Sequence, residues 1–277
     1  MNVVEKILAQ HSVGLHKAYV REGDVVLVRV DWTMASELTW KSMDSLFARI
    51  GRPPLPRPDR FWLAVDHTVD PRINNTRSKP RALIKLASDF AHEVGLAEFK
   101  PANQEIMHTE FARQRSEPGM LVVGADSHTC SAGGMGALAI GLGASDVLMP
   151  LVTGQTWLRV PGVVLIEFTG RPRFGVGGKD TILYILRTLR RNTAALDRVV
   201  YFAGPGLRHL SADARFAMCN MCAELGALSG VCEADSAVTL DTFRKRKRDC
   251  NCEGAGKDKG KNADDDQMCV FRPDPGC

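Results

Sequence analysis

Apolar and polar positions alternate along the chain in short blocks that predict strands and helices in turn. Blocks rich in branched apolar residues, bounded by glycine, proline or charged residues, predict strands at 24–31, 61–66, 120–124, 163–169 and 199–203. Helical periodicity predicts helices at 3–10, 81–94, 181–190 and 211–227, the last with Ser211 as its N-cap. The glycine-rich apolar segment 135–149 predicts one further, buried helix. Strands alternating with helices predict an α/β fold with a largely parallel sheet.

Composition narrows the class of protein. The chain has 277 residues, of which 44% are hydrophobic and 25% charged, and these values exclude wholesale disorder. A net charge of +4 and 6% aromatic residues give no support for a nucleic-acid surface. The apolar run 135–152 is interrupted by Ser145 and Asp146, which favours a buried segment over a membrane span. We therefore expect a globular protein with neither a nucleic-acid nor a membrane partner.

The N-terminus and the cysteines bear on the cellular compartment. Residues 1–14 predict a short amphipathic helix with charged side chains, which is not typical of a secretory signal. Eight cysteines in a chain of this length do not form a small disulfide framework. We expect free thiols or metal ligands in a reducing compartment, the cytoplasm, with the mitochondrion as the alternative.

The segment 122–136, VVGADSHTCSAGGMG, is the most informative for chemistry. A predicted buried strand ends, and a loop then presents Asp126, Ser127 and His128 where α/β proteins bind ligands. These groups suit proton transfer and hydrogen bonding, and the glycines that follow would let the backbone approach a ligand. Alternatively, Asp126 and Ser127 only cap the next helix. The residues alone leave both interpretations open.

Other histidines and carboxylates give weaker signals. Asp66 and His67 follow a second predicted strand, where an Asp can orient a His and raise its pKa, as a general acid requires. His108 is a third candidate. We assign no functional role to His11, His16, His92 or His209.

A third segment, MCNMCAELGA at 218–227, places Asn220 and Glu224 four residues apart, on one face of the predicted helix. A histidine is a natural partner for Glu224. Cys219 and Cys222 form a C-x-x-C pair, but without a second pair at zinc-site spacing we interpret them as ordinary thiols.

Composition changes near residue 244. The basic block RKRKR at 244–248 precedes a stretch rich in glycine, lysine and aspartate, so 244–269 predicts a linker and its basic block a solvated loop. Apolar character returns at Val270 and Phe271.

These segments, in order, resemble the aconitase superfamily, in particular the large-subunit type of 3-isopropylmalate dehydratase and homoaconitase. The resemblance covers roughly residues 3–241 and rests on EKILAQH, DVVLVRVDWTMA, VDHTVD, IMHTEF, VVGADSHTCSAGGMGALAIGLGASDV, TGQTWLRVP, GGKDTILYIL and NMCAELGA. It implies three-layer α/β/α domains with largely parallel sheets. The first would span 1–159 and part of a second 160–243, with the linker at 244–269 and the start of a truncated segment at 270–277.

The resemblance also implies a hydro-lyase reaction on a small hydroxy di- or tricarboxylate at a [4Fe-4S] cluster acting as Lewis acid. His67, oriented by Asp66, would protonate the departing hydroxyl, and Asp126 with His108 would lie beside the iron-bound water. Ser127 would bind a substrate carboxylate. His128 would contact the substrate, and Glu224 would be its carboxylate partner. Asn220 would form a hydrogen bond toward the cluster.

The sequence departs from the family pattern in the cofactor ligands. The family's cluster cysteines, substrate arginines and serine base lie downstream of the matched region, so we expect no cluster ligand within this chain, a truncated form, and possible dependence on a separate swivel-domain subunit. Ser36-Glu37 stands where the family usually has His-Asp, so we carry no substrate contact over to it. The alternatives are an inactive α/β protein that binds a carboxylate or a protein partner, and a thiol-rich metal or redox module.

Overall fold

The computed structural model describes residues 1–70, 72, 78–236 and 238, and it confirms the predicted α/β fold with parallel sheets. The larger, five-stranded sheet has the order β4-β3-β2-β5-β6, with every neighbouring pair parallel. Its strands are β2 (Trp32–Ser36), β3 (Phe61–Ala64), β4 (Phe99–Lys100), β5 (Leu121–Gly124) and β6 (Leu138–Gly141).

Helices cover both faces of this sheet and make three layers. The first face carries α2 (Glu37–Arg49), α4 (Ser78–Val94) and α6 (Ala144–Thr153), and the opposite face carries α5 (Met107–Gln114) and the 3-10 segment η2 (Ser127–Met135). Successive side chains of β3 point to opposite faces of the sheet, so neighbouring residues pack against different helices. Phe61 packs with Trp40 of α2 and Phe90 of α4, whereas Trp62 packs edge-on against Phe111 of α5.

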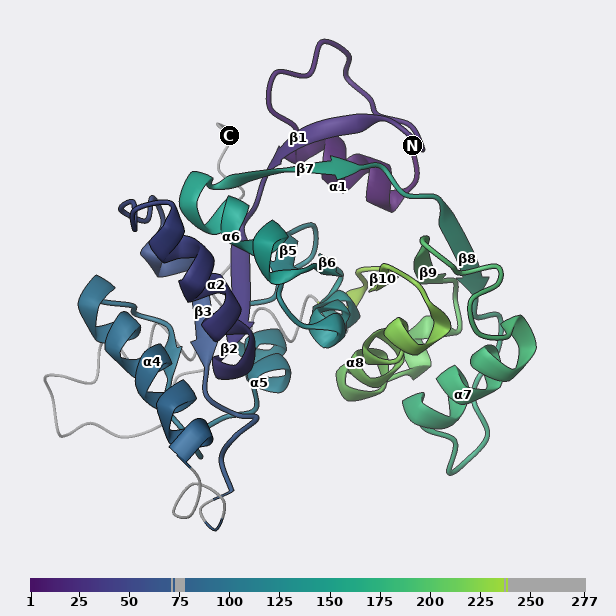
Figure 1. Ribbon diagram of the computed structural model, residues 1–277. Helices are drawn as coiled ribbons and strands as arrows, with labels where there is room; N and C mark the ends of the chain where they lie inside the picture. Colours follow the sequence, from purple (N-terminus) through teal and green to yellow (C-terminus); the bar gives the residue numbers. More distant parts are fainter. Residues whose placement is uncertain (71, 73–77, 237, 239–277) are drawn as a thin grey trace, which may run out of the picture.

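A second, three-stranded parallel sheet has the order β10-β9-β8. It comprises β8 (Val163–Glu167), β9 (Val199–Ala203) and β10 (Ser229–Cys232), and packs with α7 (Gly178–Leu189) and α8 (Ala212–Asn220). Figure 1 shows this green group on the right and the blue helices α2 and α4 of the larger sheet on the left. One apolar cluster holding Leu121 and Leu138 from the larger sheet with Val199 and Val231 from the smaller joins the two.

The N-terminal part lies against that shared cluster. It consists of α1 (Val3–His11) and β1 (Val25–Arg29), which pairs antiparallel with β7 (Gln155–Arg159). The predicted strand at 24–31 is therefore present but outside the parallel sheets. His11, for which we predicted no functional role, bonds the Asp31 carboxylate through Nε2 at 2.7 Å. The described part of the chain contains no helix with the length and apolar character needed to cross a bilayer.

The predicted helix at 135–149 is wrong. Residues 138–141 form strand β6 beside β5, and helix α6 begins only at Ala144. A short apolar run fits a buried strand or a buried helix equally well, so periodicity could not distinguish them. Strand β2, the centre of the larger sheet, was not predicted at all.

The predicted helix at 211–227 is too long. Ser211 does cap it, accepting the Ala214 N–H at 3.2 Å, but α8 ends at Asn220. A separate 3-10 turn, η4 (Ala223–Leu225), follows and closes at Gly226 in the left-handed conformation. Asn220 and Glu224 therefore do not share a helix face, contrary to the prediction. Further 3-10 turns are η1 (Pro58–Arg60) and η3 (Leu207–His209).

We propose the boundary between the two α/β units near residue 160, because β7 ends at Arg159 and β8 begins at Val163. The predicted linker and terminal segment, 244–269 and 270–277, lie outside the described residues.

The glycines of η2 serve close packing within the protein. A Cβ on Gly133 would overlap the carbonyl oxygen of Gly230 in β10, and one on Gly134 would lie 2.7 Å from the backbone nitrogen of Phe216 in α8. We expected these glycines to let the backbone approach a ligand. At both positions the backbone instead approaches another segment of the chain itself. They join η2 to the smaller sheet.

Substituting Gly133→Ala should destabilise the protein by roughly 3 kcal/mol, because backbone would have to move to remove the overlap. The free energy of unfolding, measured with urea, checks this. The matched control is Gly170→Ala, at which an added Cβ meets nothing within 4 Å. An equal effect of the two substitutions would contradict the proposed close approach of η2 and β10.

Candidate functional site

Polar side chains gather where neighbouring parallel strands of the larger sheet end. Glu37 follows β2, Asp66 and His67 lie just beyond β3, and Asp126 just beyond β5. Because β3 and β5 flank β2 in parallel register, their carboxyl ends meet at one edge. Helix α5, which follows β4, brings His108 to the same edge.

The Asp126 carboxylate lies between two imidazole rings. His108 Nε2 donates to Oδ1 at 3.0 Å, and His67 Nε2 lies 3.7 Å from Oδ2 as an ion pair. Oδ1 also accepts the His128 N–H at 2.8 Å, which makes Asp126 the N-cap of η2. Asp126 therefore caps η2 and also faces two histidines, so capping alone does not describe its contacts.

Asp66 fixes the other side of the His67 ring. Its Oδ1 accepts from His67 Nδ1 at 2.6 Å, and its Oδ2 accepts the Met107 N–H at 2.8 Å. The second bond ties the segment after β3 to the start of α5. His67 is thereby held at both ring nitrogens by carboxylates.

His128 is oriented from the smaller sheet's side. Its Nδ1 donates to the carbonyl oxygen of Asn220 at 3.1 Å, which leaves Nε2 facing Glu224 Oε1 at 3.8 Å. The Asn220 side chain donates to Ser131 Oγ at 2.9 Å. Although the two residues lie on different elements, Asn220 and Glu224 both reach the histidine. The His108 and His128 rings are 6.4 Å apart, so the two groups are adjacent.

The carboxylates govern protonation here. Asp126 and Asp66 raise the pKa of His67 to about 10, against the opposing effect of partial burial. His108 and His67 hold the pKa of Asp126 far below its ordinary value. Burial acts to raise the pKa of Asp66, but the hydrogen bonds from His67 and from the Met107 N–H outweigh it and leave that pKa lowered. At neutral pH the site therefore holds a charged imidazolium between two carboxylates.

Some polar atoms of the site have free bonding capacity. Among the described residues, His108 Nδ1 and Glu224 Oε2 are buried with no hydrogen-bond partner. Because His108 Nε2 carries the hydrogen donated to Asp126, Nδ1 of the neutral ring is an acceptor. Ser127, at the start of η2, is exposed. The exposed Ser127 hydroxyl can bind a polar ligand, whereas His108 Nδ1 and Glu224 Oε2 are closed off from solvent.

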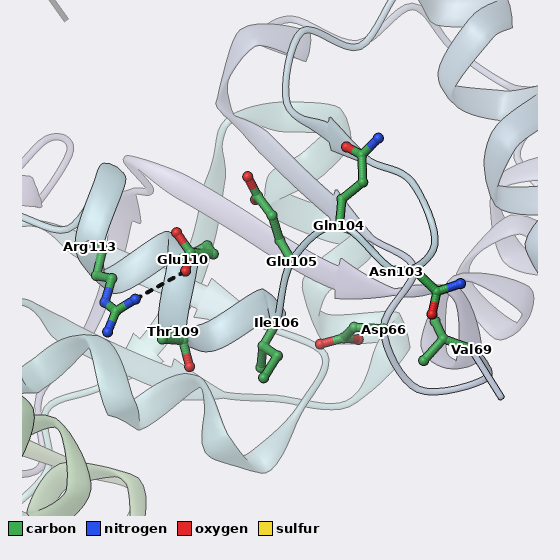
Figure 2. Close-up of a pocket in the computed structure, with 9 residues that line it drawn as sticks. All are labelled: Asp66, Val69, Asn103, Gln104, Glu105, Ile106, Thr109, Glu110 and Arg113. Atoms are coloured by element: carbon green, nitrogen blue, oxygen red, sulfur yellow. Dashed lines mark hydrogen bonds and ion pairs between the residues drawn. The ribbon is translucent and has the colours of Figure 1, made fainter. Parts of the chain in front are cut away.

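A pocket of about 430 Å³ adjoins this group on the side of α5. Figure 2 shows Asp66 and Val69 at one end of its lining and Glu110, paired with Arg113, at the other. Of the predicted site residues, Asp66 lines this pocket, whereas His67 and Asp126 do not. The pocket extends the site away from the histidines.

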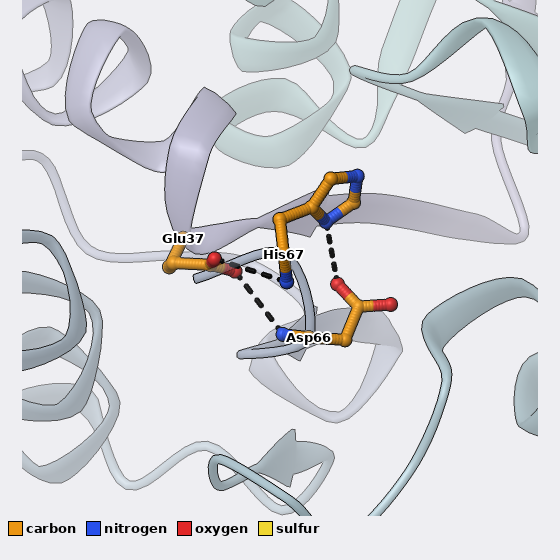
Figure 3. Close-up of side chains that lie close together, drawn as sticks. All are labelled: Glu37, Asp66 and His67. Carbon is orange, nitrogen blue, oxygen red and sulfur yellow. Dashed lines mark hydrogen bonds and ion pairs between the residues drawn. The ribbon is translucent and has the colours of Figure 1, made fainter. Parts of the chain in front are cut away.

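Glu37 is the residue that sequence reasoning missed. Its carboxylate lies with Asp66 and His67 in the one cluster of potential metal ligands in the described ranges (Figure 3). Both Glu37 oxygens already accept backbone N–H groups, and Asp66 already bonds His67 and the Met107 N–H. Hydrogen bonds within the protein thus account for the cluster. The sequence did offer one signal for Glu37: it stands directly after β2, at the position where the family usually has an aspartate.

The described cysteines form no comparable cluster. Cys130, Cys219, Cys222 and Cys232 are buried and free. The Sγ atoms of Cys219 and Cys232 are 3.7 Å apart, but across the described residues no three thiols lie close enough to share a metal ion. This geometry gives no support to the thiol-rich metal module. Cys250, Cys252, Cys269 and Cys277 lie outside the described residues.

Comparison with known proteins agrees with this geometry. Residues 5–272 match the aconitase family (aconitate hydratase). Aconitase htyD of Aspergillus rugulosus is 52% identical over 86% of this chain and 27% of its own length. The 3-isopropylmalate dehydratase large subunit gloJ of Glarea lozoyensis is 46% identical over 86% of this chain and 25% of its own length. The large subunit of the same name from Sulfurihydrogenibium sp. is 34% identical over 89% and 56%.

The chain thus spans 25% to 56% of the length of these relatives. The predicted resemblance is confirmed over nearly the whole sequence. With its parallel sheets and its strand-end histidines and carboxylates, the chain belongs to the aconitase family.

Proposed function

We propose that this chain supplies the acid–base and part of the substrate-binding apparatus of an aconitase-type hydro-lyase. The reaction would remove water from a small hydroxy di- or tricarboxylate and add it back. The observation that supports this most is the His67 imidazolium held between Asp66 and Asp126. Family membership supplies the reaction class.

His67 has the protonation state that a general acid needs. With a pKa of about 10 its ring is charged at neutral pH, so a proton is always available. The departing hydroxide is the conjugate base of water, whose pKa is about 15.7, so the imidazolium remains the stronger acid by roughly six units. Protonation of the leaving group is therefore downhill despite the raised pKa.

The other residues fall into roles around that step. Asp126, held by its hydrogen bond from His108, would orient water beside the substrate through its carboxylate. Ser127 would bond a substrate carboxylate from the exposed start of η2. His128, its tautomer fixed by the Asn220 carbonyl, would bond the substrate with Glu224 behind it.

The described cysteines do not fit the [4Fe-4S] cluster that the family resemblance implies. Iron–sulfur clusters bind thiolates. Cys130, Cys219, Cys222 and Cys232 are instead buried in the apolar core around the smaller sheet, where they pack as hydrophobic side chains. We propose that the cluster's cysteine ligands come from outside the described residues, and we derive no step through the cluster.

The names of relatives support a partner, whereas the compartment is inferred from the N-terminal segment and the cysteines alone. Relatives are named large subunits of a dehydratase. We propose that this chain acts with a separate swivel-domain subunit on a small hydroxy acid, in the cytoplasm.

The test is turnover by the chain together with a swivel-domain subunit, after anaerobic treatment with iron and sulfide, with malate-type and citrate-type hydroxy acids. The unsaturated product is followed by its ultraviolet absorbance. His67→Asn should lower kcat by about 10²–10⁴-fold, because the general acid is lost. His209→Asn, on an exposed residue of η3, should leave it unchanged. Full turnover without His67 would contradict its assigned role, and carboxylate binding without any turnover would favour the inactive α/β alternative.

The raised pKa of His67 also makes stability depend on pH. A group whose pKa rises from 6.5 to about 10 on folding stabilises the folded state fully below pH 6.5, and this contribution is lost as pH rises toward 10. Asp126→Asn removes the largest cause of the shift, so the free energy of unfolding should fall less between these two pH values than in the wild type.

Urea unfolding at both pH values measures this difference. Asp89→Asn, at an exposed carboxylate paired with Lys85, is the control and should keep the wild-type dependence. The interpretation is wrong if Asp126→Asn retains the full dependence.

A further inference from the structure

Glu37 is a fully buried carboxylate, with 0% exposure, at the first position of α2. Buried carboxylates normally pair with a cation or a metal. None of the ion pairs recorded among the described residues includes Glu37. Its position directly after β2 places it beside the end of β3, because Ser36 pairs with Ala64.

The partners of Glu37 are three successive backbone N–H groups. Oε1 accepts from His67 at 3.1 Å and from Thr68 at 2.7 Å, and Oε2 accepts from Asp66 at 3.2 Å (Figure 3). Successive N–H groups that converge in this way form a binding site for an anion. The N-terminus of α2 adds a favourable dipole. Glu37 thus occupies, from inside the fold, an anion site made by the segment that carries His67.

This arrangement limits movement of that segment. Shifting residues 66–68 would leave a buried carboxylate without partners, which is costly. The same backbone carries Asp66, which bonds His67 Nδ1, so Glu37 acts on both members of the pair. The carboxylates around His67 are Asp66 beyond β3, Asp126 at η2 and Glu37 at α2, and the His108 ring on α5 lies across Asp126.

We propose that Glu37 is a positioning residue, which holds the backbone of 66–68 so that His67 lies between Asp66 and Asp126 and which stabilises the positive charge of the ring. Its importance for turnover rests on the proposed function, but the positioning itself does not. The nearby negative charge of Glu37 adds to the raised pKa of His67. Glu37 needs no contact with substrate for this role.

The test uses the 277-residue chain and requires no turnover. Glu37→Gln replaces one carboxylate oxygen by an NH₂ donor, so at least one of the three N–H groups loses its acceptor, and the charge is removed. Amide hydrogen exchange at residues 66–68 should accelerate by about tenfold or more. In a histidine-ring NMR titration, the pKa of His67 should shift downward from its wild-type value.

The matched control is Glu98→Gln. Glu98 is also buried, with 9% exposure, but it bonds Arg115 and not the 66–68 backbone. This variant should change neither readout. Unchanged exchange and an unchanged His67 pKa in Glu37→Gln would overturn the proposal, and so would equal effects in Glu98→Gln.

Glu37→Asp keeps the proposal testable if Glu37→Gln does not fold. The shorter side chain keeps its charge but withdraws the carboxylate from the N–H groups, so exchange at 66–68 should accelerate while the His67 ring stays charged at neutral pH. Wild-type exchange in this variant would overturn the proposal. Loss of turnover in His67→Asn bears on the proposed function alone, so the two hypotheses can fail separately.

Discussion

The site depends on one carboxylate shared by two imidazole rings. Asp126 bonds His108, faces His67 as an ion pair and caps η2 through the His128 N–H. A half-buried carboxylate is costly without such partners, and the two rings would lose their orientation without the carboxylate. The protonation of His67, the orientation of His108 and the course of the chain through η2 thus depend on a single side chain.

The fold brings these groups together through parallel strand ends and close backbone packing. β3, β2 and β5 deliver Asp66, Glu37 and Asp126 to one edge of the larger sheet. The smaller sheet contributes from the other side, because α8 and η4 place the Asn220 carbonyl and Glu224 against His128. The glycines of η2 permit this junction. Neither sheet alone forms the whole site.

Much of this arrangement could be predicted from the sequence. Short apolar blocks ending in Asp-His and Asp-Ser-His located two strand ends, because a buried strand followed by a polar turn leaves a local pattern. Strand β2 was missed because the predicted strand ended at Asp31, and the five residues that follow were not recognised as a second strand that belongs to a different sheet. The helix predicted over 135–149 failed because a buried strand and a buried helix look alike in composition.

What could not be predicted depends on contacts between distant segments. Glu37 acts on backbone N–H groups about thirty residues away, and backbone bonds carry no side-chain signature. Asn220 reaches His128 through its carbonyl, which any residue possesses, so the spacing of Asn220 and Glu224 suggested a helix face that does not exist. Family resemblance identified the side chains, whereas their connections required the structure.

The most direct test of this account is an NMR titration of the histidine rings in the unmodified chain. The account predicts that His67 stays protonated through neutral pH and titrates with a midpoint near 10, since carboxylates face both of its nitrogens. A midpoint near the ordinary value of 6.5 would contradict the claim that Asp66 and Asp126 hold an imidazolium between them.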